Sequence, residues 1–229
     1  MRFVYLIIQH IKLYTQKTIA NNKNKKLIER SSTLTDDRLH MLHSYINRIK
    51  HFEISLRSRP DFSIPENLIK TINLYRYLLI ESSDFSIAYH HLLQATPSKS
   101  IKDRWSENFY IRILCTLSYE FLNDAIEVTG SKTNKLIESY SLNEANKNRI
   151  SVDIKEIRIK LQLIYKRHNI FLKEVRNNTM AHKNHESYIT IDYIERLDFQ
   201  KSVEVFNEIS HCQSLLIQFC GNLISMESE

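Results

Sequence analysis

The chain has 229 residues, a formal net charge of +6 at pH 7, only two glycines and three prolines, and three scattered cysteines. Its length supports a full-sized hydrophobic core, which excludes a small scaffold that depends on disulfides or a metal ion. The scarcity of glycine and proline argues against a fold rich in strands and tight turns and favours an all-α protein with long helices.

The same properties bear on location and partners. Cys115, Cys212 and Cys220 have no metal-binding spacing, and a sparse, odd set of cysteines fits a reducing cytoplasm. The apolar opening Met1–Ile8 is interrupted by Gln9 and is too short to span a bilayer. No small-residue cleavage site follows it, so we expect neither a membrane association nor a signal peptide. The mild positive charge favours polyanionic partners, but only in combination with a site.

The N-terminal part, residues 1–95, is expected to form helices of unassigned role. A first helix is predicted over residues 1–20, and the polar run 20–30 predicts a solvated loop or a frayed helix end. A second helix is expected from about Asp36 to a stop before Arg59-Pro60, because the residue before a proline avoids helical geometry.

A capping box with proline in the first turn, Ser63-Ile64-Pro65-Glu66, predicts the start of a third helix, which can continue to Ala95. Residues 94–100, with Pro97, are the clearest linker in the sequence. We place the boundary between the N-terminal region and the rest of the chain there.

Residues 100–225 are expected to form an up-and-down helical bundle. Ser100-Ile101-Lys102-Asp103 resembles a capped helix start, and Gly130 predicts the end of this helix in a left-handed cap. A short helix is expected at 135–140, and Ser141-Leu142-Asn143-Glu144 caps a long one. A loop at 183–187 and an extended turn at 188–192 are expected to precede a last helix, whose apolar seam is Val205, Ile209, Cys212, Leu216, Phe219 and Leu223. Three long amphipathic helices and a short one suffice for a bundle.

The long helix carries an apolar seam that ends in polar residues. The seam positions, three or four residues apart, are Ile150, Ile154, Ile157, Leu161, Ile164, His168, Phe171 and Val175, and the next two are Asn178 and His182. The register therefore directs an amide and an imidazole into the interior or into a cleft. Burying such groups costs free energy unless they are hydrogen-bonded, so the presence of these polar residues on the seam needs an explanation.

Arg176 and His182 allow two interpretations. On a continuous helix they lie about 120° apart around the axis and about 9 Å apart along it, which is poor for joint action on one group. They converge if the helix kinks or ends at Asn177-Asn178, since asparagine is a weak helix former. In the alternative interpretation, the charge of Arg176 stabilises a helix C-terminus and His182 fills a polar niche in the core.

The pattern Arg176-Asn177-x-x-x-Ala181-His182 resembles the arginine, polar residue, short gap and histidine signature of the HEPN superfamily. Four to six residues separate the arginine and the histidine in that family, and five separate them in this chain. The alanine before the histidine and the helical flanks look most like the abortive-phage-infection branch. The resemblance covers about residues 100–225.

That resemblance implies a bundle of four long helices plus a short one, and additional N-terminal helices would precede it in this chain. It also implies a homodimer that brings two copies of the motif together in a cleft. The implied activity is metal-independent cleavage of RNA in the cytoplasm, with no cofactor, by a toxin or antiphage-defence effector that an antitoxin or another defence protein can control.

Carried onto this sequence, the resemblance makes His182 the general acid or base, Arg176 the cation that neutralises the scissile phosphate, and Asn177 the residue that orients one of them. Imidazole titrates near neutrality, and guanidinium can make two parallel hydrogen bonds to a phosphate. Four flanking basic residues would add positive potential for RNA: Lys166, Arg167, Lys173 and Lys183.

His182 and His185 lack a third ligand at a recognisable spacing, so no metal site is expected. An alternative function remains open, in which the chain is a catalytically silent helical module that binds RNA, a nucleotide or a protein partner. Many HEPN proteins are of this kind.

Overall fold

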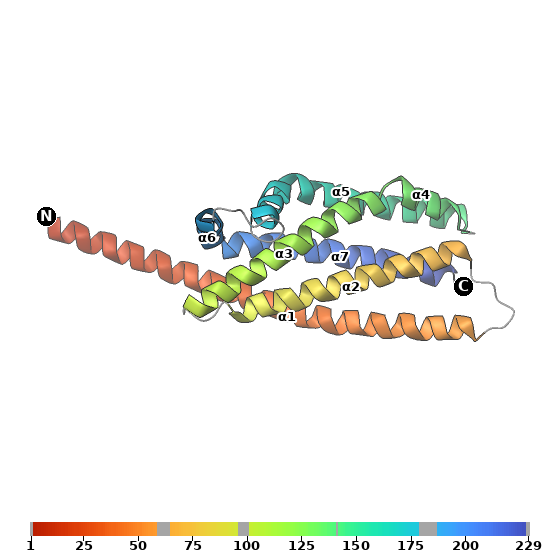
Figure 1. Cartoon of the computed structure of the whole chain (residues 1–229), viewed down its shortest axis with the longest axis horizontal. Helices are drawn as coiled ribbons and strands as arrows, with labels where there is room; N and C mark the ends of the chain where they lie inside the picture. Colours follow the sequence, from red (N-terminus) through yellow and green to blue (C-terminus); the bar gives the residue numbers. More distant parts are fainter. Residues whose placement is uncertain (1, 59–64, 96–100, 141, 179–186, 228–229) are drawn as a thin grey trace.

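The computed structural model describes residues 2–58, 65–95, 101–140, 142–178 and 187–227, and these residues form helices with no strand among them. The all-α prediction is therefore confirmed. In chain order the helices are α1 (Arg2–Arg57), α2 (Glu66–Ala95), α3 (Ile101–Val128), α4 (Ser131–Glu138), α5 (Glu144–Arg176), α6 (Ser187–Glu195) and α7 (Phe199–Glu227) (Figure 1).

Several helix boundaries lie where the sequence predicts them. α1 ends at Arg57, shortly before Pro60, and α2 begins at Glu66. Asn143 is the N-cap of α5, because its side-chain oxygen accepts a hydrogen bond from the backbone N–H of Asn146 at 2.9 Å.

Four local predictions are wrong. The run 20–30 is not a loop, since α1 is continuous through it. That run contains no glycine or proline, and lysine, its commonest charge, is a good helix former. The segment 188–192 is not an extended turn but part of helix α6, in which Ile194 is buried. Tertiary contact has outweighed the strand preference of its isoleucine and tyrosine residues.

Gly130 does not form a left-handed cap, because no described glycine has a positive φ. Its N–H donates to the carbonyl oxygen of Glu127 at 3.1 Å, and the chain passes directly into α4 at Ser131. The short helix therefore begins four residues earlier than residue 135, where the sequence predicts it.

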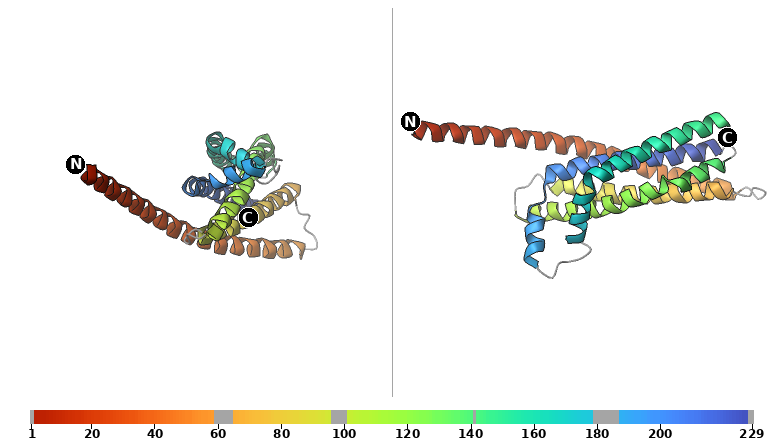
Figure 2. Two further views of the ribbon diagram at one scale, coloured as in Figure 1. Left: turned by 60° about the vertical axis from the view of Figure 1, so that its left-hand side comes forward. Right: turned by 90° about the horizontal axis from the view of Figure 1, so that it is seen from above.

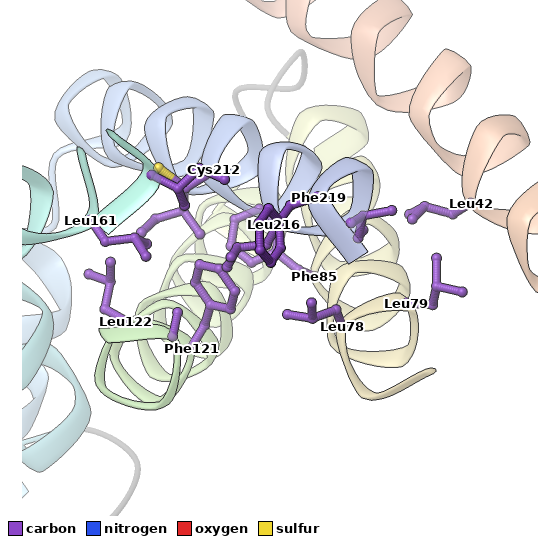
Figure 3. Close-up of a cluster of buried hydrophobic side chains, with 14 of the residues drawn as sticks. Leu42, Leu78, Leu79, Phe85, Phe121, Leu122, Leu161, Cys212, Leu216 and Phe219 are labelled. Atoms are coloured by element: carbon purple, nitrogen blue, oxygen red, sulfur yellow. The ribbon is translucent and has the colours of Figure 1, made fainter. Parts of the chain in front are cut away.

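The hydrophobic core lies between α2, α3, α5 and α7, and α1 adds Leu42 and Ile49 to it. α3 packs against α5 and α2, and α7 packs against α2 and α5 (Figure 1). Side chains from four helices meet in the interior, among them Phe85, Phe121, Leu161 and Leu216 (Figure 3). Phe85 precedes the predicted boundary at residues 94–100 and the other three follow it, so one core is shared by both sides of that linker.

Helix α1 is attached to the outside of this bundle. Its second half packs against α2, whereas its first half projects well beyond the other helices (Figures 1 and 2). Arg38 of α1, which is only 7% exposed, donates hydrogen bonds to both oxygens of Ser210 and, at 2.7 Å, to the side-chain oxygen of Gln213. Arg38 thereby ties α1 to α7. Among the described residues, none of the helices is both long and apolar enough to span a membrane.

Candidate functional site

Helix α5 positions the candidate site. Its core-facing side chains are Ile150, Ile154, Ile157, Leu161, Ile164, Leu172 and Val175. The predicted seam is confirmed at most positions, but His168 and Phe171 are only partly buried and Leu172 takes the interior place. This packing fixes the helix as far as Val175, one residue before the motif begins.

The helix ends at the motif. Arg176 is the last residue of α5, and Asn177 is its C-cap, whose N–H donates to the carbonyl oxygens of Lys173 and Glu174. Asn177 and Asn178 form a wider, π-type turn. Both asparagines keep a helical backbone, and the residues that follow them lie outside the described part of the chain, so the convergence of Arg176 and His182 stays a prediction.

Arg176 is held by residues of α3 and by its own neighbour. Its Nε donates to Oε1 of Glu120 at 2.8 Å, and its Nη1 donates to Oδ1 of Asn177 at 3.3 Å. The guanidinium also lies over the ring of Tyr119, 5.3 Å from the ring centroid, a cation–π geometry. The side chain of Arg176 is 29% exposed and that of Glu120 is 49% exposed. The guanidinium is thus oriented on two sides and still reaches the surface.

Helix α6 folds back beside the end of α5 (Figures 1 and 2). The hydroxyl of Tyr193 donates to Oε2 of Glu174 at 3.3 Å, and Arg104 of α3 donates to the carbonyl oxygen of Glu195 at 3.0 Å. Burial, and secondarily the charge of Glu174, raises the pKa of Tyr193 to about 12, so its hydroxyl stays protonated and acts as a donor. α6 thus contacts α5 two residues before Arg176, and it contacts α3 near the N-terminal end of that helix.

The other half of the motif lies outside the described residues. His182, proposed from the sequence as the general acid or base, and the flanking Lys183 both fall in the segment 179–186. The structure shows that the side chains of the neighbouring residues Arg176 and Asn177 are hydrogen-bonded to each other. The position of His182 relative to them stays a prediction.

The flanking basic residues on α5 differ from one another. Lys166 and Lys173 are exposed and seven residues apart, which places them on the same side of the helix, and Lys173 is one turn from Arg176. Arg167 instead pairs with Oε1 of Glu208 on α7 at 2.6 Å, so its charge is largely offset. Of these three, Lys166 and Lys173 are the residues that remain available to a polyanion.

His168 is a further titratable residue of this helix. Its Nε2 lies 3.3 Å from Oε2 of Glu208. Burial lowers the pKa of His168 below its ordinary value of 6.5, although Glu208 opposes the shift. His168 is thus only partly buried, beside Glu208, whereas its seam position predicts a core side chain.

The sequence does not single out Tyr119 and Glu120, the α3 residues that hold Arg176. They are 56 or more residues away along the chain, and only the packing of α3 on α5 brings them together. Within the described part of the chain, no group of three histidine, cysteine or acidic side chains is arranged to hold a metal ion.

Comparisons with models of protein families, with curated proteins and with solved structures find no match to this chain. The functional interpretation therefore depends on the motif residues and on the geometry around Arg176.

Proposed function

We propose that this protein is a metal-independent endoribonuclease of the HEPN type that acts as a toxin or abortive-infection effector in antiphage defence. The observation that carries the proposal is the position of Arg176 at the end of a core helix, partly exposed and bonded to Asn177. The residues that follow complete the Arg-Asn-x-x-x-Ala-His motif.

The reaction needs a proton carrier and a fixed cation. The 2′-hydroxyl oxygen of one nucleotide attacks the adjacent phosphorus, and the bond from phosphorus to the 5′-oxygen of the next nucleotide breaks. His182 removes the 2′-hydroxyl proton or donates one to the leaving 5′-oxygen, for which imidazole has a suitable pKa. Arg176 stabilises the charge that builds up on the phosphate, and Asn177 orients its guanidinium. The products are a 2′,3′-cyclic phosphate and a 5′-hydroxyl.

Two structural features support this assignment of roles. The bond from Arg176 to Asn177 is of the kind that an orienting residue would make. The bond between Tyr193 and Glu174 brings the helix after the motif close to the helix before it, two residues before Arg176. The exposed Lys166 and Lys173 add positive charge on the same helix, which suits an RNA substrate.

A second candidate function is favoured by the ion pair between Arg176 and Glu120. An arginine that is already paired with a carboxylate can have a purely structural role. The chain would then be a catalytically silent helical module that binds RNA, a nucleotide or a protein partner.

The homodimer that the resemblance implies is part of the first proposal. Four large apolar side chains of α5 point away from the core and are exposed: Val152, Ile159, Leu163 and Ile170. Ile170 is 72% exposed and lies six residues before Arg176, about 9 Å along the helix. A second copy that covers Ile170 would bring two motifs near one another.

We therefore expect Ile170→Glu to weaken self-association, measured by sedimentation velocity across a concentration series, with the exposed Ile80→Glu on α2 as its control.

The decisive experiment is a cleavage assay on mixed cellular RNA in the presence of a chelator, with the product ends analysed. The ribonuclease proposal predicts cyclic-phosphate ends from the parent protein and none from His182→Ala, provided that circular dichroism shows both to be equally folded. If a folded parent leaves the RNA intact under conditions in which it binds RNA, the silent module is the better description.

A further inference from the structure

The outward face of α3 carries a line of ring and cationic side chains that leads to Arg176. Trp105, Phe109, Arg112, Thr116 and Tyr119 follow one another at steps of four, three, four and three residues, which aligns them along one side of the helix. These five residues are called the α3 stripe. It is about 21 Å long, from the helical rise over its 14 steps.

Two of the three aromatic residues of the α3 stripe, Trp105 and Phe109, lie outside the core, whereas Tyr119 is partly buried and packs against it. The opposite side of α3 supplies the buried side chains Ile111, Leu114 and Phe121. Trp105 and Phe109, in contrast, are each 44% exposed. Large aromatic side chains are usually buried for most of their area, so two exposed rings one turn apart indicate a surface that contacts a ligand.

Cations accompany these rings. The guanidinium of Arg112 lies over the ring of Phe109, 5.7 Å from its centroid, while its Nε donates to the backbone oxygen of Asn108. Arg104 is exposed and precedes Trp105 directly. At the other end of the stripe, the guanidinium of Arg176 lies over Tyr119. Rings and guanidinium groups therefore occur together along the stripe, from Trp105 to the candidate site.

This combination of rings and cations matches the chemistry of unpaired nucleotides. Single-stranded nucleic acid is bound by aromatic side chains on which bases stack and by positive charges that follow the phosphates. Double-stranded RNA offers no free base faces, so exposed rings contribute nothing to holding it. A protein partner would also cover the rings, but it would not require a line of cations that ends at a proposed phosphate-binding arginine.

We propose that the α3 stripe is a base-stacking subsite for single-stranded RNA, which binds the nucleotides that flank the scissile bond and directs the phosphate to Arg176. Bases stack on Trp105 and Phe109, and Arg112 contacts the intervening phosphate. The role in directing a scissile phosphate rests on the proposed ribonuclease function, whereas binding at the stripe can be measured without any cleavage.

The test is fluorescence anisotropy of a labelled single-stranded oligonucleotide with the His182→Ala protein, which leaves the RNA intact if His182 is catalytic. We expect Trp105→Leu and Phe109→Leu each to weaken binding about tenfold. Trp105→Phe, which keeps a ring, retains most of the affinity. Ile80→Ala, which removes an exposed apolar side chain on α2, serves as a control and binds like the parent.

Salt dependence separates the two kinds of contact. Arg112→Leu should reduce the slope of log affinity against log salt by about one, because one phosphate contact is lost. The leucine substitutions of the two rings should leave that slope unchanged. A duplex of the same sequence should bind more weakly and should be insensitive to both ring substitutions.

Several results would overturn the subsite: unchanged single-strand affinity in both ring variants, no single-strand binding by the parent, or an equal loss of duplex binding. A changed sedimentation coefficient in the ring variants, with RNA affinity retained, would assign the α3 stripe to a protein contact.

The outcomes that would refute the ribonuclease proposal are distinct from these. A parent that binds through the stripe without cleaving refutes only the ribonuclease, and a parent that cleaves while its ring variants bind normally refutes only the subsite.

Discussion

Two arginines, Arg38 and Arg176, each join helices that are far apart in the chain, yet their surroundings are opposite. Arg38 is buried and bonded to the neutral groups of Ser210 and Gln213, and burial lowers its pKa to about 10. Arg176 is partly exposed and paired with the carboxylate of Glu120. Arg38 is only 7% exposed, in the wall of a cleft between α1 and α7, whereas the side chain of Arg176 is 29% exposed and is oriented by its partners. The same residue type thus has a structural role in one place and is available for chemistry in the other.

The largest difference should appear in RNA cleavage by Arg176→Ala. Loss of a group that stabilises transition-state charge typically lowers the rate by about 100-fold or more. The free energy of unfolding should change by less than about 1 kcal/mol, because exposed ion pairs contribute little to stability. Initial rates on a defined RNA, beside a urea titration, measure both quantities. Arg176→Lys keeps the charge but not the fork geometry and should be intermediate. If Arg176→Ala cleaved RNA as fast as the parent protein, Arg176 would have no role in the mechanism.

Arg38→Met should lower the stability of the protein and leave RNA cleavage unchanged, the opposite of Arg176→Ala. Removing the guanidinium leaves the buried side-chain oxygen of Gln213 without its donor, which is expected to lower the free energy of unfolding by about 1–3 kcal/mol. The rate of RNA cleavage per folded molecule should stay the same. Urea titration gives the first value, and cleavage assays well below the unfolding midpoint give the second. Lys50→Met removes an exposed charge from the same helix and should be nearly neutral. A similarly small effect of Arg38→Met would show that the contact to α7 does not stabilise α1.

The contrast between these arginines also shows what the sequence can predict. The all-α class and the core-facing positions of α5 and α7 follow from periodicity and local propensity, which act over a few residues. The partners of both arginines do not. Glu120 and Ser210 are 56 and 172 residues away from the arginines that they contact, and no spacing rule links positions so far apart.

Errors in local structure have a related cause. Residues 188–192 have the composition of a strand but form part of a short helix, since packing decides the conformation of short segments more than propensity does. The polar run 20–30 lies in α1 because nothing in it interrupts a helix. Sequence therefore predicts long, strongly periodic elements best, and it predicts least where a short segment depends on contacts with distant residues.

Glu120→Gln tests the difference between the two arginines by removing the carboxylate partner of Arg176. Arg38 has no carboxylate partner among the described residues, but Arg176 shares its charge with Glu120. Replacing that carboxylate by an amide removes one negative charge beside the proposed phosphate position. RNA affinity should rise about two- to tenfold, with the largest gain at low salt. Glu204→Gln changes the net charge equally at an exposed position on α7 and controls for the overall charge. Equal affinity gains in both variants would indicate a general charge effect and not a local one.

The smallest expected effect is the contribution of His168 to the pH dependence of stability. Unlike the two arginines, this residue changes its charge near neutral pH. Burial lowers the pKa of His168 below its unfolded value of 6.5, so the unfolded chain takes up a proton more readily than the folded one. This histidine therefore contributes a loss of stability as pH falls through 6.5, whereas both arginines stay charged. The melting temperature of His168→Gln should drop less than that of the parent between about pH 7.5 and about pH 5.5. His211→Gln, an exposed histidine on α7, should follow the parent. An identical drop in all three proteins would mean that Glu208 compensates fully for the burial of His168.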